Sequence, residues 1–186
     1  MLGQLPRTVV INGREVSINT DYRFALISFE AISDPDLSDG EKLFCMVDAL
    51  IGVDNLREGE MKEAIEKCEW FLNGGKENEP HHESAKLMDW IQDEQMIFSA
   101  VNDVAGFEIR ERSYLHWWTF LGYFNEIREG LFSNVLMIRQ KRSRGKELDK
   151  SEREFYLKNK DIIDLKNRYS KEELEYIEKL NKMLGD

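Results

Sequence analysis

Residues 114–127 are the most apolar stretch of the chain and leave few options for its fold. Nine of these fourteen residues are large and apolar, and His116, Thr119 and Glu126 mark a narrow polar edge. Ser113 can cap a helix that begins here, and that helix would be apolar almost all round. Such a helix either lies at the centre of the core or gives one face to a partner. At about 14 residues it is too short to cross a membrane.

Composition indicates one folded domain around this segment. The chain has 186 residues and a net charge of −10, with 41% hydrophobic and 11% aromatic residues. This aromatic content argues against disorder. No apolar run of about 18 residues and no signal-peptide core occurs, so we expect a cytoplasmic protein without a membrane contact. Cys45 and Cys68 are not in metal-site spacing and are expected to be buried, reduced thiols.

The first predicted element is a β-hairpin. Asn12-Gly13, the strongest two-residue turn signal, lies between the β-prone runs 8–11 and 14–18. This turn sets Val9 opposite Val16. The residues that then share the apolar face are Val9, Ile11, Val16 and Ile18. A lone hairpin is marginally stable in water, so this face must pack on another element.

Apolar residues at helical spacing predict a series of helices after the hairpin. The first carries Phe24, Ile27 and Ala31 on one side, and Ser38 with Glu41 forms a capping box for the second. The expected helices cover residues 20–32, 38–51, 61–72, 87–105, 113–127 and 131–138. The fold class is therefore mainly α, with an N-terminal β-hairpin packed on a bundle of about five to six helices.

A C-terminal helical extension follows this bundle. Residues 139–186 contain 14 basic and 11 acidic residues, a net charge of +3, which leaves −13 for residues 1–138. Capping boxes at Ser151/Glu154 and Ser170/Glu173 predict helices in the extension, with thinner apolar stripes. We expect an acidic core over 1–138 and a basic-leaning appendage over 139–186, together one structural domain.

Two patterns resemble ligand sites but are incomplete. His81-His82-Glu83 with Glu79 holds one Glu-x-x-His copy, contains Pro80 and lies in a loop-like stretch, which argues against a metal site. Gly74-Gly75-Lys76 is followed by Glu77 where a phosphate loop needs Ser or Thr, so it indicates the end of a helix. No acid–base pair is in a catalytic arrangement, and we expect no catalytic residue, cofactor or metal.

The segment 139–146 is strongly basic. Its five cations within eight residues are Arg139, Lys141, Arg142, Arg144 and Lys146. Cations near a helix C-terminus favour the helix dipole, which is one interpretation. The other is contact with an acidic partner through the first four, or with nucleic acid. The segment has no interleaved aromatic residues, and the acidic body repels nucleic acid.

The apolar segment supplies the other candidate site. Trp117, Trp118, Phe120 and Phe124 either form a central core helix or line a docking surface, because buried aromatic residues commonly anchor interfaces. The two interpretations are compatible if one face of the helix lines a groove.

Four motifs spread over the chain resemble the bacteriophage gene-product-fifteen family. They are Ile18-Asn-Thr-Asp-Tyr-Arg23, Leu37-Ser-Asp39 with Glu41-Lys-Leu43, His116-Trp-Trp-Thr-Phe120 and Ser151-Glu-Arg-Glu154. The family is encoded in the tail morphogenesis cluster of siphophages and related prophages. No family site can be transferred residue by residue.

The resemblance implies a tail-assembly chaperone. Such a protein is non-catalytic, binds the tape measure protein, and keeps it soluble in the host cytoplasm while tail tube subunits assemble. It is not expected in the mature virion, and its oligomeric state is left open. The alternative is a small helical nucleic-acid-binding or regulatory phage protein that uses segment 139–146.

Overall fold

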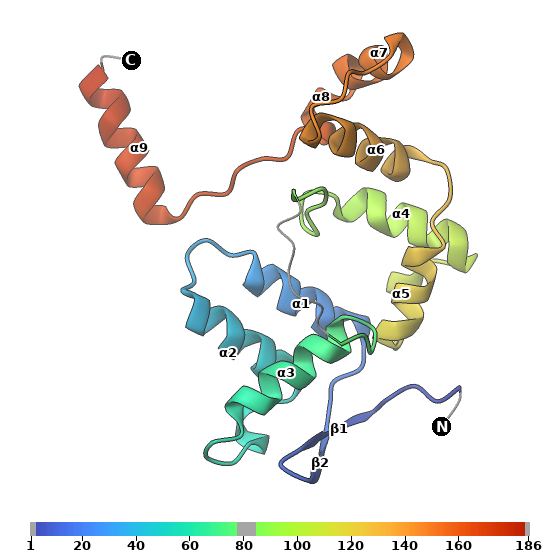
Figure 1. The fold of residues 1–186 in the computed structure, drawn as a ribbon, viewed down its shortest axis with the longest axis vertical. Helices are drawn as coiled ribbons and strands as arrows, with labels where there is room; N and C mark the ends of the chain where they lie inside the picture. Colours follow the sequence, from blue (N-terminus) through green and yellow to red (C-terminus); the bar gives the residue numbers. More distant parts are fainter. Residues whose placement is uncertain (1–2, 78–84, 185–186) are drawn as a thin grey trace.

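The computed structural model describes residues 3–77 and 85–184 and is mainly helical, with an N-terminal antiparallel hairpin (Figure 1). The strands are β1 (Thr8–Ile11) and β2 (Arg14–Ser17). The bundle contains α1 (Tyr22–Ile32), α2 (Asp39–Leu50), α3 (Met61–Leu72), α4 (Glu94–Ala105), α5 (Trp117–Asn125) and α6 (Leu131–Ser143). Beyond it come α7 (Lys150–Lys158), α8 (Lys160–Ile163) and α9 (Lys171–Leu184). The predicted fold class is confirmed.

The hairpin forms in the predicted register, with Val9 opposite Val16. Asn12 and Gly13 have φ values of 49° and 72°, and positive φ at both positions is what a type I′ turn requires. All four residues of the predicted apolar face are buried. The hairpin contacts α3, where the backbone N–H of Asn12 donates to Glu63 Oε2 over 2.8 Å. Packing on α3 therefore stabilises a hairpin that is too small to stand alone.

α1 packs on the core through a side other than the one that carries Phe24 and Ile27. Phe24 and Ile27 are 37% and 50% exposed, whereas Tyr22, Ala25 and Ser28 are buried. The Ser28 hydroxyl donates to the Phe24 carbonyl over 2.9 Å, so a polar residue can be buried without losing its hydrogen bond. The small side chains of Ala25 and Ser28 allow close packing on this side. As a result, apolar residues lie on two sides of α1.

α4 begins at Glu94 rather than near residue 87. Asp89 Oδ1 accepts hydrogen bonds from the N–H groups of Ile91 and Gln92 over 3.0 and 2.9 Å. Asp93 Oδ2 accepts from the Asp89 N–H over 2.9 Å. Aspartate side chains that bond to nearby backbone N–H groups favour turns over helix. The two carboxylates therefore hold the residues before α4 in turns.

α5 also begins later than predicted. Its N-cap is His116, not Ser113, and His116 Nδ1 accepts a hydrogen bond from the Trp118 N–H over 3.0 Å. An antiparallel bridge pairs His116 with Asp21. Tyr22, the first residue of α1, lies beside this bridge, so the bridge fastens the start of α5 to the start of α1. The pairing also explains the late start, because residues in a bridge are extended.

The capping boxes of the C-terminal part have different outcomes. Ser170 and Glu173 cap α9 as predicted, with N–H to side-chain bonds of 2.8 and 3.1 Å. The box of α7 is formed by Asp149 and Glu152 instead of Ser151/Glu154. The carboxylate of Asp149 bonds to the Glu152 N–H over 2.9 Å, so α7 begins two residues earlier than expected.

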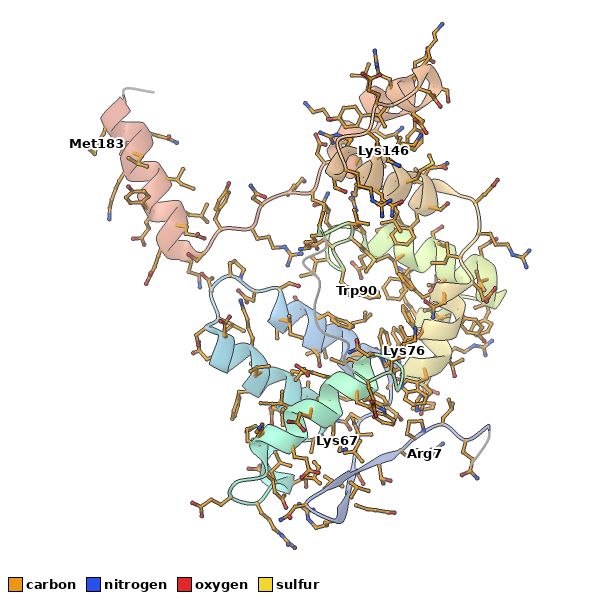
Figure 2. All side chains as sticks on the ribbon, in the orientation of Figure 1. Arg7, Lys67, Lys76, Trp90, Lys146 and Met183 are labelled. Carbon is orange, nitrogen blue, oxygen red and sulfur yellow. The ribbon has the colours of Figure 1, made fainter. Side chains whose placement is uncertain are left out.

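The predicted boundary at 138/139 falls inside α6, which continues to Ser143. Val135 and Ile138 of α6 form a small second core with Ile163 of α8. α7 and α8 therefore belong with α6, whereas α9 stands apart from the bundle (Figure 1). Met183, near the end of α9, lies clear of the rest of the molecule (Figure 2), whereas Lys171 at its start pairs with Asp36. The appendage thus begins after α8.

Candidate functional site

The four aromatic residues predicted to bind a partner are divided between the core and its edge. Trp117 and Phe120 have no exposed surface, whereas Trp118 and Phe124 are half-buried. The indole N–H groups of Trp117 and Trp118 donate to the carbonyls of the last two residues of α3 over 3.0 and 2.9 Å. These carbonyls have no partner inside their own helix. Trp117 and Trp118 therefore join α5 to the end of α3, and partner binding by the set stays a prediction.

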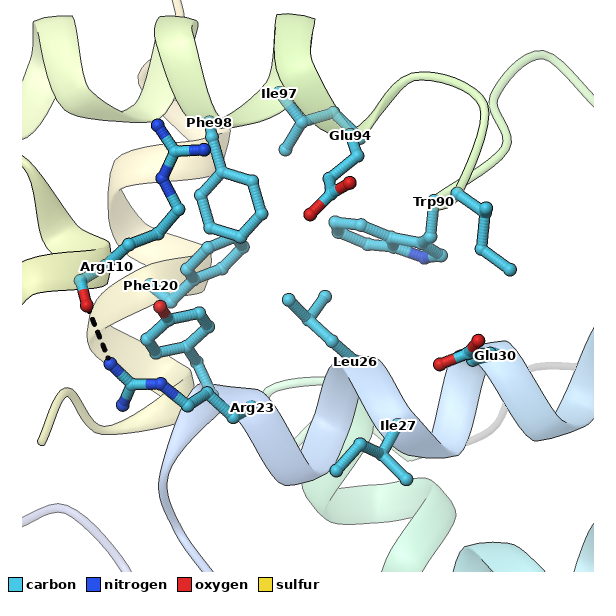
Figure 3. A pocket seen from close by; sticks show the side chains of 12 residues that line it. Arg23, Leu26, Ile27, Glu30, Trp90, Glu94, Ile97, Phe98, Arg110 and Phe120 are labelled. Carbon is cyan, nitrogen blue, oxygen red and sulfur yellow. Dashed lines mark hydrogen bonds between the residues drawn. The ribbon is translucent and has the colours of Figure 1, made fainter.

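An apolar groove of about 460 Å³ lies between α1 and α4 (Figure 3). Its apolar lining consists of Tyr22, Leu26, Ile27, Trp90, Ile91, Ile97, Phe98 and Phe120. Ile27 and Ile91 are 50% and 45% exposed, while Phe120 is fully buried. The groove thus has Phe120 at its floor and two accessible isoleucines at its rim. Of the predicted aromatic set, Phe120 lines this groove.

Aromatic contacts give the groove firm walls. Tyr22 stacks on Phe120 with ring centroids 5.1 Å apart, and Phe98 meets Tyr22 edge-on at 6.2 Å. Trp90 contacts Phe124 at 5.4 Å. Ring pairs in such geometries stabilise a fold by more than the burial of their apolar area alone. A preformed apolar groove between helices suits the apolar face of an amphipathic helix.

Charged residues border the groove. Arg23 and Arg110 lie where α1 begins, and Glu30 lies near where α1 ends (Figure 3). The Arg110 side chain donates two hydrogen bonds to Glu108, which hold the pKa of that carboxyl at about 2. Among the described residues, Glu30 and Glu94 have no ion-pair partner within 4.0 Å. The uncompensated charge of the groove is therefore negative.

The sequence did not predict this groove, although α1 contains a signal for it. Eight of the eleven residues of α1 are apolar, more than a helix with one buried stripe needs. The sequence placed Phe24 and Ile27 on one side of this helix, and the structure turns that side outward. Trp90 was expected on a helix and instead lies in the turns before α4. Nothing local to Trp90 indicates that it faces α1.

Arg139, predicted to contact an acidic partner, is instead an internal residue. It is 6% exposed and forms a bidentate ion pair with Asp93 at 2.6 and 2.8 Å. It also donates to the carbonyls of Leu87, Ile162 and Ile163. The guanidinium fork matches the carboxylate and fixes three segments at one point. Its partner was not visible in sequence because Asp93 lies 46 residues away.

Two of the four remaining cations of the basic segment are also paired within the chain. Lys141 pairs with Glu152, and Arg142 pairs with Asp164. Arg144 is exposed. These ion pairs neutralise much of the charge that a nucleic-acid contact would use. The geometry therefore gives the nucleic-acid alternative little support.

The candidate metal residues cannot be placed. His81, His82 and Glu83 lie outside the described residues. Over 3–77 and 85–184, no three His, Cys, Asp or Glu side chains gather in a metal-binding cluster. Burial raises the pKa of the Cys68 thiol to about 12, and Cys45 is half-buried. In the same described ranges, no helix has both the length and the apolar character needed to cross a membrane.

Comparison with known proteins gives one match. A family model described as bacteriophage Gp15 protein matches residues 1–165. No curated protein and no solved structure matches the chain. The matched residues include the hairpin, the groove and the second core, and the match ends between α8 and α9.

Proposed function

The chain belongs to the bacteriophage Gp15 protein family, and from this we propose that it is a non-catalytic tail-assembly chaperone. It binds the tape measure protein in the host cytoplasm and keeps it soluble until tail tube subunits assemble around it. The observation that supports this proposal is the apolar groove between α1 and α4.

The groove has the properties that such a role needs. A tape measure protein is long and helical, and it aggregates when its apolar faces lack partners. An amphipathic helix can place apolar residues against Ile27, Trp90 and Phe98 and leave its polar side in water. The chain's net charge of −10 keeps the complex soluble.

Co-expression with the tape measure protein of the same phage tests the proposal. We expect the native chain to increase the soluble fraction of the tape measure protein and to co-purify with it. Ile27→Asp should remove both effects, because it places a charge at the groove rim without disturbing a buried residue. Leu157→Asp is the matched control, since Leu157 is 68% exposed on α7, away from the groove lining.

Two results would contradict the proposal. In the first, the native chain neither solubilises nor co-purifies with the tape measure protein. In the second, Ile27→Asp and Leu157→Asp behave alike while both remain folded by circular dichroism, which would place the contact elsewhere.

A further inference from the structure

α9 has an apolar face without a covering element in the described chain. Leu174 and Leu180 are 52% and 37% exposed, and Tyr176 and Met183 are 64% and 82% exposed. With Ile177, these residues cover about half of the helix circumference at 100° per residue. Helices this amphipathic usually bury their apolar face. The N-terminal cap of α9 is formed, since Ser170 and Glu173 bond reciprocally.

The charges of α9 are ordered along its axis. Residues 171–177 contain three Glu and one Lys, a net charge of −2, while 178–184 contain one Glu and two Lys, a net charge of +1. The groove has the reverse order along α1, with Arg23 and Arg110 where α1 begins and Glu30 where it ends. Arg23 and Arg110 are already paired with Asp21 and Glu108, so among the described residues the unpaired charges of the groove are Glu30 and Glu94. The lysines of α9 complement the groove when the C-terminal end of α9 lies beside these carboxylates.

Within one molecule, α9 cannot easily lie in its own groove in this orientation, because its first residue is held near the end of α1. The N–H of Lys171, the first residue of α9, donates to Asp36 Oδ1 over 2.7 Å, only four residues beyond the end of α1. Folding back from there would bring the acidic end of α9 toward Glu30 and its lysines toward Arg23. The acidic end of α9 would then meet the unpaired carboxylate of Glu30. A helix from another molecule has no such restriction.

We propose that α9 of one copy binds the α1–α4 groove of a second copy, and that the exchange is reciprocal. The apolar face of α9 covers Ile27 and Ile91, and Lys179 lies near Glu30. The resulting dimer has a two-fold axis and an isologous interface. The proposal concerns the purified chain alone, so it does not depend on tape measure binding.

The oligomeric state of the full chain tests this exchange. In a sedimentation equilibrium series over increasing concentration, the native chain should dimerise. Ile27→Asp on the groove and Leu180→Asp on α9 should each weaken the dimer by at least about tenfold, since each removes one buried aliphatic group per site. Leu157→Asp, the matched control on α7, should leave the dimer unchanged.

Mixing the two variants distinguishes exchange from other modes of association. The Ile27→Asp chain retains an intact α9, and the Leu180→Asp chain retains an intact groove. Their mixture should form a heterodimer through one α9–groove contact, more tightly than either variant self-associates. If α9 paired with α9 instead, Ile27→Asp would have no effect and the mixture would gain nothing.

A charge exchange tests the orientation. Glu30 and Lys179 are exposed, so their replacement should not disturb the fold. Glu30→Lys and Lys179→Glu should each weaken the dimer by roughly two- to fivefold, and the double variant should recover it. A monomeric native chain overturns the proposal, as does a dimer that Ile27→Asp and Leu180→Asp leave intact.

Discussion

Arg139 connects more of the molecule than any other basic side chain of segment 139–146. Its guanidinium pairs with Asp93 before α4 and donates to the carbonyls of Ile162 and Ile163 in α8. The side chains of Arg139 and Asp93 are at most 5% exposed. A buried ion pair is not in itself strongly stabilising, because both charges lose their hydration. Removal of one partner is costly, since it leaves the other charge buried and unpaired. The importance of the pair can therefore be tested by removing one partner and then both.

We expect Arg139→Met to lower the free energy of unfolding by about 3–5 kcal/mol, measured by urea denaturation. The double variant Asp93→Asn/Arg139→Met should recover part of this loss, because it leaves no unpaired carboxylate buried beside the new side chain. Lys182→Ala is the control, since Lys182 pairs with the exposed Glu178 and should change little. If Arg139→Met lowers the free energy of unfolding by less than about 1 kcal/mol, the Arg139–Asp93 pair is exposed to water rather than buried.

His116 makes the stability depend on pH. Burial lowers its pKa below 6.5, the bond to the Pro6 carbonyl opposes this, and Arg7 lowers it further. Because Nδ1 accepts from the Trp118 N–H, the neutral ring is the form that fits the fold. The folded state therefore binds the proton less readily than the unfolded state. The contribution of His116 to the free energy of unfolding is complete above pH 6.5, and it is lost as the pH falls through the lowered pKa.

The prediction is a fall in melting temperature between pH 7 and pH 5 that the variant His116→Asn lacks. Asn retains an N-cap acceptor but does not titrate in this range. The measurement is thermal unfolding at a series of pH values. Equal pH dependence of the native chain and His116→Asn would assign the effect to other groups.

At the scale of elements, local patterns were predictable and contacts between distant residues were not. The hairpin register follows from the Asn12-Gly13 turn and from the alternation of apolar and polar residues beside it. All of these residues lie between Thr8 and Ser17. The start of α5 depends on the pairing of His116 with Asp21, 95 residues earlier. Ser113 was a reasonable cap by residue type, but no local signal reveals that bridge. The groove was missed for the same reason, because it joins α1 to Trp90.

The end of α3 offers a prediction about the packing of α5. Gly75 has φ +86°, and a Cβ added there would lie 2.7 Å from Trp118 Cη2. Trp118 cannot easily move, since its indole N–H bonds to the Phe71 carbonyl. Gly75→Ala should therefore cost about 2–3 kcal/mol by urea unfolding. Gly106→Ala, also at positive φ but with open space around its Cβ, should cost only about 1 kcal/mol.

At the scale of the whole molecule, the charge division of the sequence does not coincide with the structural division. Residues 139–186 carry a net charge of +3, yet Lys141 and Arg142 of α6 form ion pairs with Glu152 of α7 and with Asp164 after α8. Arg139 pairs with Asp93 before α4 and donates to the carbonyls of Ile162 and Ile163 in α8. The basic charge thus serves the contact between two parts of one body. The segment that stands apart is α9, which also lies beyond the family match at residue 165.

This division predicts that the chain folds without α9. Truncation after Ser170 removes the Lys171–Asp36 contact but retains Arg168, which pairs with the buried Asp89. At a concentration where the native chain is monomeric, we expect the truncated and native chains to have the same urea midpoint, since association would otherwise stabilise the native chain. Arg168→Ala in the full chain should lower the midpoint, because it weakens the compensation of a carboxylate that is 4% exposed. A truncation that destabilises the monomer as much as Arg139→Met would instead mean that α9 packs on its own bundle in solution.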